Sequence, residues 1–223
     1  MIRFIITLLV TLSPYTQAND DYLKVLNQFK SVCLEKPYSS CTNMLKGTTE
    51  AQQLLANTLK LMAINKEFST LYVSTYGEEA FIEFNDAFKF STSSIDLSDY
   101  SLKSTSNTQF VLKDVEGNTL IFENTKQGWK LNVDKSLSGV AVKEAKPFIE
   151  YSIGAHLSLI SKIETSLPVD DAFKLGGRYF AVATYDYFDE KTKIKLDEVF
   201  ASKNIDAAKL RQDMLYFYHQ QNQ

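Results

Sequence analysis

The sequence predicts an α+β protein in which helices flank a small antiparallel sheet. In the first and last parts of the chain, apolar residues recur every three or four positions, the spacing of amphipathic helices. Between about residues 94 and 134 they alternate with polar residues, as in strands buried on one face. Only 8 glycines and 4 prolines interrupt the 223 residues, which favours long regular elements. We therefore expect helices, a meander sheet and then a C-terminal group of helices.

Several helices are expected before the sheet. Asp20 or Asp21 can cap the first one. Its apolar stripe consists of Leu23, Leu26, Phe29 and Cys33. A second helix is expected from about residue 48, followed by two shorter helical stretches over 66–75 and 78–88.

The expected sheet is an antiparallel meander of short strands. A phase slip in the alternation near Asp99 indicates a bulge. Strands over 109–113 and 119–123 are joined by a glycine-containing turn, and a second such turn precedes the last strand. The buried face of that last strand is expected to carry Trp129, Leu131 and Val133.

Helical spacing returns after about residue 140. The first apolar stripe there consists of Ile149, Ile153, Leu157 and Ile160. Pro147 suits the first turn of this helix, because a first-turn residue needs no backbone N–H. A helix from about residue 170 is expected to be interrupted by Gly176-Gly177 or to start after it. The last two helices are expected over 192–201 and 207–219.

The segment 81–133 ends in Gly128-Trp129-Lys130-Leu131. A helix followed by a meander whose last strand begins in this way resembles small exported proteins of the nuclear-transport-factor-two-like (cystatin-like) fold. In that fold a curved sheet wraps a helix and makes a cone with a pocket, so the resemblance implies a pocket. It covers about a quarter of the chain, and 90 residues follow Val133, where that fold should be nearly complete. The family is functionally mixed, so the resemblance implies no activity.

The N-terminus has the three parts of a secretory signal peptide over 1–18. Arg3 supplies the positive charge, 4–12 is apolar, and Thr16 and Ala18 are small residues suited to a cleavage site. An uncleaved anchor is the alternative. We expect 19–223 to be a periplasmic or secreted protein with no membrane span, because no later apolar segment is long enough. A single domain is expected, with a helical subdomain from about residue 140 as the alternative.

Cys33 and Cys41 are the two cysteines of the chain. Outside the reducing cytosol, an even pair this close in sequence predicts a disulfide. Free thiols and a redox pair are the alternatives, although a thioredoxin-type site has two residues between its cysteines and here seven intervene.

The charge balance is acidic. The chain has 24 basic and 27 acidic side chains, a net charge of −3, and loss of Arg3 with the signal leaves 23 against 27, or −4. Nucleic acids and anionic membranes require clustered positive charge, so the sequence predicts neither as a partner.

Few residues point to chemistry. The two histidines, His156 and His219, have no neighbouring ligands at metal-site spacing, so we expect neither a metal nor another cofactor. No nucleophile elbow of the Gly-x-Ser-x-Gly type is present, so no catalytic residue is predicted. Gly176, Gly177 and Arg178 form a candidate anion site if a helix starts there, and close helix packing is the alternative.

Aromatic residues crowd the last quarter of the chain. Neighbouring residues on a helix point about 100° apart, so the run Tyr216–Tyr218 cannot all face one core. Leu210 and Met214 share a face with Phe217, which we expect to point inward. The candidate contact surface therefore consists of Tyr216, Tyr218, Tyr185 and Tyr187.

Two functions remain open from the sequence. The first is an exported, non-enzymatic protein that holds an unknown protein or a small apolar ligand on an apolar-aromatic surface. The second is a small cofactor-free enzyme with a pocket lined by Tyr and Asp side chains.

Overall fold

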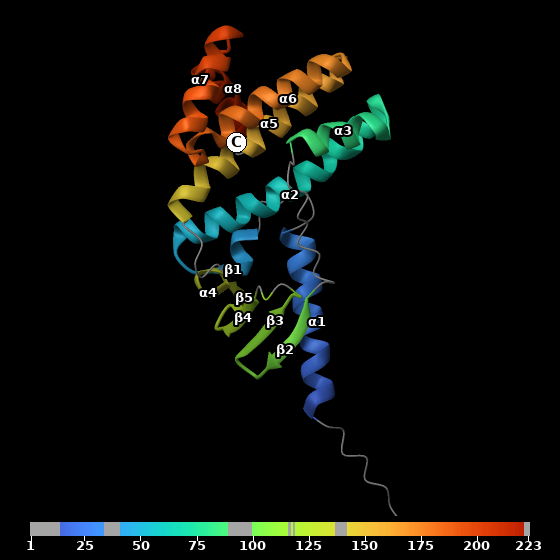
Figure 1. Ribbon diagram of the computed structural model, residues 1–223. Coiled ribbons are helices and arrows are strands. Elements are labelled where there is room, and N and C mark those ends of the chain that lie inside the picture. Colours follow the sequence, from blue (N-terminus) through green and yellow to red (C-terminus); the bar gives the residue numbers. More distant parts are fainter. Residues whose placement is uncertain are drawn as a thin grey trace, which may run out of the picture.

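The protein has two lobes, one built on a sheet and the other on helices. The computed structural model describes residues 14–33, 41–88, 100–115, 117, 119–136 and 142–220. The expected apolar part of the signal and the phase slip at Asp99 lie outside these residues. Figure 1 shows the sheet and helix α1 at one end and helices α3 and α5 to α8 at the other, with α2 between them.

Helix α2 (Thr49–Tyr76) connects the two lobes as one unbroken helix of 28 residues. Its first half buries Ala51, Leu55 and Leu59 in the sheet core, and its second half buries Ile64, Phe68 and Tyr72 in the helical core. Within each stripe the buried residues are four positions apart, but Ile64 comes five positions after Leu59. At 100° per residue the two stripes point about 140° apart, so the halves of α2 bury nearly opposite sides. The separate helix expected over 66–75 is therefore wrong.

The sheet has five strands in the order β1-β5-β4-β3-β2. Their bounds are β1 Leu45–Lys46, β2 Ser101–Thr105, β3 Gln109–Lys113, β4 Thr119–Thr125 and β5 Gly128–Asn132. Strands β2 to β5 form the expected antiparallel meander, with a register shift between Leu102 and Ser104. Strand β1 pairs in parallel with β5, so the sheet is mixed and not a simple meander. A two-residue strand carries too little alternation to be recognised in the sequence.

One face of the sheet packs against α1 (Pro14–Cys33) and the first half of α2. Phe29 of α1 makes an edge-to-face contact with Phe122, their ring centres 5.5 Å apart. Val25 lies on the buried face with Phe29, whereas Leu23, expected there, is exposed. Trp129 is half-buried at the margin of this core, 5.1 Å from the ring of Phe110, and not the fully buried residue expected.

The two cysteines staple the end of α1 to the 3-10 turn η1 (Cys41–Met44). The sulfur atoms of Cys33 and Cys41 lie at disulfide distance, with the Cα atoms 4.5 Å apart, as the spacing predicts. Both side chains are buried in the sheet core.

The helical lobe contains α3 (Glu78–Phe88), α5 (Val142–Glu164), α6 (Val169–Thr184), α7 (Glu190–Ser202) and α8 (Ala207–Gln220). A short 3-10 turn, η3 (Tyr185–Tyr187), joins α6 to α7, and a four-residue helix, α4 (Val133–Ser136), follows the sheet. The bounds of α3, α7 and α8 agree closely with the helices expected there. Helix α5 begins before its expected start, so Pro147 lies inside it and not in its first turn.

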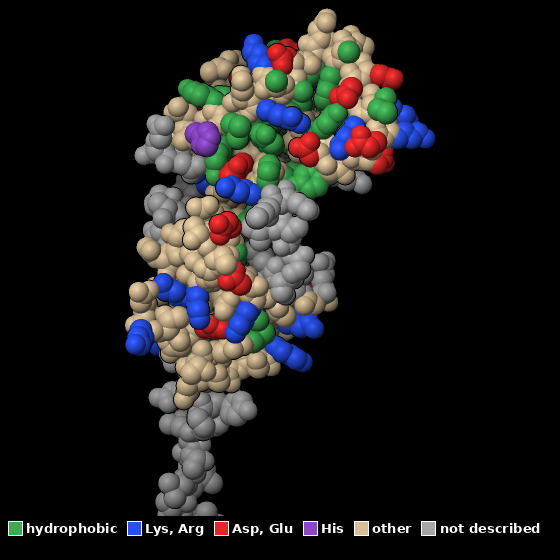
Figure 2. Space-filling model, turned by 90° about the vertical axis from the view of Figure 1, so that its left-hand side faces the viewer, with side chains coloured by type: hydrophobic (Ala, Val, Ile, Leu, Met, Phe, Trp, Pro, Cys, Tyr) green, Lys and Arg blue, Asp and Glu red, His purple; other side chains and the backbone are tan. Residues whose placement is uncertain are grey.

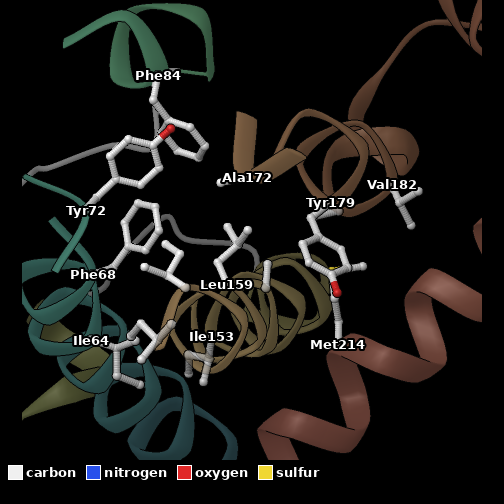
Figure 3. Packing of buried hydrophobic residues seen from close by; sticks show 14 of the residues in the cluster. Ile64, Phe68, Tyr72, Phe84, Ile153, Leu159, Ala172, Tyr179, Val182 and Met214 are labelled. Carbon is white, nitrogen blue, oxygen red and sulfur yellow. The ribbon is translucent and has the colours of Figure 1, made fainter. Parts of the chain in front are cut away.

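Helix α5 runs through the middle of the helical core (Figure 3). Phe68 and Tyr72 of α2 form a cluster of rings with Phe84 of α3, their centres 4.9–5.4 Å apart. On the other side, α8 crosses α5 at Gly154. A Cβ atom at that glycine would lie 1.8 Å from the backbone oxygen of Met214, so the two helices approach closely because this residue has no side chain.

Gly154→Ala should therefore destabilise the helical lobe. The new methyl group meets backbone that cannot turn aside, so we expect the free energy of unfolding to fall by about 3 kcal/mol or more. Gly177→Ala is the matched control, because its Cβ would meet only the edge of the Phe88 ring, at 3.0 Å. Alanine has a higher helix propensity than glycine, which offsets the cost of that contact, so we expect the free energy of unfolding of this variant to change by no more than about 1 kcal/mol. Urea unfolding measures both variants, and equal losses would contradict the close crossing.

Candidate functional site

A groove of about 540 Å³ lies between α2 and α5. Its walls combine apolar and charged side chains, namely Ala63, Leu71, Ile160, Lys66, Glu67 and Glu164, together with two hydroxyl residues. Those hydroxyls, Thr70 and Ser74, donate to backbone oxygens of their own helix. They are satisfied by α2 itself and are not aimed across the groove.

A second groove, of about 370 Å³, lies between the β1–α2 junction and the turn that joins β4 to β5. We call it the lysine groove, because Lys46, Lys126 and Lys130 line it. Gln52, Thr125 and Gln127 add polar groups to the same walls. Lys46 comes from β1, Lys126 from the turn and Lys130 from β5, so the fold brings distant parts of the sequence together here.

An ion-pair network adjoins the lysine groove. The carboxylate of Glu123, on β4, accepts hydrogen bonds from Lys135 and from Lys46, each at 2.6 Å. These bonds, to Lys135 first and then to Lys46, hold the pKa of Glu123 down at about 2. The network joins β1 and α4 to the central part of the sheet.

Lysine side chains extend over the outer face of the sheet, the face away from α1. The strand registers put Lys113 and Lys130 on the same face as Glu123, and Lys46 lies beside them. In the view of Figure 2, basic side chains lie on both lobes, whereas hydrophobic side chains are gathered mainly on the helical lobe. The two lobes therefore offer surfaces of different chemistry.

Two of the four predicted contact tyrosines are exposed. Tyr216 on α8 is 60% exposed and Tyr187 on η3 is 54% exposed. Ile194 and Val199 on α7, which the sequence analysis did not single out, are exposed in the same lobe. The spacing of apolar residues in this helix did not predict that Ile194 and Val199 are exposed. In the structure, Phe200 is the one buried side chain of α7.

Tyr218 is not part of the contact surface. It is only 8% exposed, and its hydroxyl accepts a hydrogen bond from Asn57 of α2 at 3.0 Å. The buried stripe of α8 is formed by Met214 and Tyr218. Phe217, expected to point inward, is half-buried with the ammonium group of Lys162 above its ring. The phase expected for this helix is therefore off by one residue.

Tyr185 is held by contacts within the chain. Its hydroxyl donates to the Asp197 carboxylate, with both oxygens at 3.0 Å, and its ring stacks on Phe200. The guanidinium group of Arg211 lies 5.7 Å from the ring centre. Tyr185 therefore ties η3 to α7 and α8 and is a weaker candidate for a partner contact than Tyr187.

The candidate anion site does not have the helix start on which it depended. Gly176, Gly177 and Arg178 lie in the middle of α6, where backbone N–H groups are used within the helix. A Cβ at Gly176 would lie 2.4 Å from the Phe84 ring. The glycines thus allow α3 to pack closely on α6, which is the alternative that the sequence left open.

Buried titratable groups of the helical core are neutral at pH 7. Burial lowers the pKa of His156 to about 4, and its Nδ1 lies 2.7 Å from the backbone oxygen of Ser152. The pKa of Tyr72 is raised to about 12, mainly by burial and further by the neighbouring Tyr76 and Glu83. A general acid or base works best with a pKa near the working pH, so these two residues are poor candidates for catalysis.

Within the described ranges, no three His, Cys, Asp or Glu side chains are grouped as a metal ion would require. Nor does any helix in these ranges have the length and apolar character needed to cross a bilayer. Comparisons with protein-family models, with curated proteins and with solved structures found no significant match to the chain. The resemblance to the cystatin-like fold therefore stays a prediction.

The Glu123 network should make stability depend on acid pH. Because the pKa of Glu123 is lowered from 4.5 to about 2 on folding, its stabilising effect is complete above pH 4.5 and is lost as the pH falls toward 2. Glu123→Gln should thus cost most stability above pH 4.5 and progressively less below it. Urea unfolding of both proteins across this pH range measures the difference in their free energies of unfolding. The contributions of the other carboxylates are common to both proteins and cancel in this difference. A difference that does not change with pH would contradict the network.

Proposed function

We propose that the protein is an exported, non-enzymatic binding protein that contacts a partner protein through its helical lobe. Export is supported by the signal-like segment 1–18 and by the placement of Cys33 and Cys41 at disulfide distance. The observation that carries the binding role is the exposure of Tyr216 on α8.

The exposed residues of the helical lobe have the composition of an interface. Tyr216, Tyr187 and Ile194 are large, more than half exposed, and lie on elements of the last quarter of the chain. Covering such a side chain contributes about 1.5–3 kcal/mol, and aromatic residues are enriched in the centres of protein interfaces. Tyr216 also carries a hydroxyl group that can form a hydrogen bond to a partner.

An enzymatic role has less support. Neither of the two grooves is lined by a tyrosine or an aspartate, although the enzyme hypothesis required a pocket of that kind. The hydroxyls in the α2–α5 groove are bonded to their own helix, and the buried His156 and Tyr72 have pKa values far from neutrality. We therefore propose binding and not catalysis.

The paired variants Tyr216→Ala and Tyr218→Ala test this role. Tyr216 is exposed, so its loss should leave the free energy of unfolding within about 0.5 kcal/mol. Tyr218 is buried and hydrogen-bonded to Asn57, so its loss should cost about 3 kcal/mol. Thermal unfolding distinguishes the two variants.

The binding itself is measured by site-specific photo-cross-linking in the protein's own host. A benzophenone amino acid replaces Tyr216 in one protein and the exposed Lys174 of α6 in the control. We expect Tyr216, and not Lys174, to yield a defined adduct with another protein or with a second copy of this chain. Absence of any adduct at Tyr216, or equal labelling at both positions, would refute the proposed role.

A further inference from the structure

The lysine groove brings the ammonium group of Lys46 together with those of Lys126 and Lys130, which are 80 or more positions further along the chain. Lys46 lies on β1, after the 3-10 turn η1, whereas Lys126 lies in the turn between β4 and β5 and Lys130 lies on β5. The parallel pairing of β1 with β5, in which Lys46 lies opposite Asn132, creates this arrangement. Like charges repel, so folding groups them at a cost that a bound anion would remove.

The acidic residues beside the groove already have partners. Glu123 binds Lys46 and Lys135, and Asp134 accepts hydrogen bonds from the backbone N–H and the hydroxyl of Thr48 at 3.0 and 2.9 Å. Asp134 thereby neutralises the start of α2.

Lys126 and Lys130 are not neutralised in this way. Lys130 donates to the uncharged amide oxygen of Gln127 at 2.9 Å, and Lys126 forms no ion pair with any described residue. The groove therefore keeps positive charge that the described part of the chain does not neutralise.

The lining indicates which anion fits. Lysine ammonium groups are compact charges with three donors each, and they bind phosphate as point charges. A phosphate group carries up to about two negative charges, against one on a carboxylate, so it gains more from several lysines. The groove is lined by lysines, with the side-chain amide nitrogen of Gln127 as a further donor, whereas the amide nitrogen of Gln52 donates to the backbone oxygen of Gly47 at 2.7 Å. Its volume of about 370 Å³ accommodates a phosphate together with part of the molecule that bears it.

We propose that the lysine groove binds a phosphate group, borne either by a soluble small molecule or by a lipid headgroup. Its lining residues come mostly from β1, β4, β5 and the turn between β4 and β5, and these strands lie in the lobe opposite α8, the helix of Tyr216 (Figure 1). The two proposals are independent, and either one can fail without the other.

The test compares two double variants with the same net charge. Lys126→Gln/Lys130→Gln removes two ammonium groups from the groove, and Lys191→Gln/Lys195→Gln removes two exposed ones from α7. Pyrophosphate binding is measured by calorimetry at low ionic strength, and vesicle binding by sedimentation with phosphatidylglycerol or with phosphatidylcholine alone. Thermal unfolding confirms that both variants are folded.

We expect the groove variant to lose about tenfold or more in affinity and the α7 variant to stay within about twofold. Pyrophosphate binding assigns the site to soluble phosphates, and binding to phosphatidylglycerol vesicles alone assigns it to a lipid headgroup. In either case added salt should weaken binding. The proposal is overturned if the unaltered protein binds neither probe, or if both variants lose affinity equally.

Discussion

The arrangement of the protein depends on α2, a single helix that belongs to two cores. Ala51, Leu55 and Leu59 pack toward the sheet, and Ile64, Phe68 and Tyr72 pack toward the helical bundle on nearly the opposite side. Neither core can form fully without its half of α2, because each half supplies large buried side chains. The helix therefore holds the two lobes together and also separates the lysine-bearing sheet surface from the aromatic helical surface.

Close packing around α5 and α6 accounts for what remains exposed. Gly154 lets α8 approach α5, and Gly176 lets the ring of Phe84 approach α6. The inner faces of these helices are thereby filled with Met214, Tyr218 and neighbouring aromatic rings. Tyr216 precedes Tyr218 by two residues, about 200° around the helix, and therefore points away from the buried stripe of α8. Its exposure follows from the phase of α8, and so does its availability to a partner.

The sequence predicts those elements whose signal is local. Strand β3 and helices α3, α7 and α8 follow from alternation, spacing and glycine positions within a few residues of their observed bounds. The continuity of α2 was missed because its buried stripe changes sides after Leu59, which resembles a break between helices. The lysine groove was missed for a different reason: Lys46 is far in the sequence from Lys126 and Lys130, and a net charge of −3 conceals their clustering on one surface. The change of sides in α2 and the lysine groove both depend on packing against segments that are distant in the sequence. The local periodicity of apolar residues carries no information about such packing.

The continuity of α2 can be measured directly with spin labels at its two ends. Gln53→Cys and Thr75→Cys place labels on exposed positions, one in each lobe, while Cys33 and Cys41 remain paired with each other. In an unbroken helix, 22 residues at 1.5 Å each separate the two backbone positions by about 33 Å. Pulsed electron–electron double resonance should therefore give one narrow distance distribution near that value. A broad distribution, or one centred well below about 33 Å, would show a break in α2 and would contradict the two-core account.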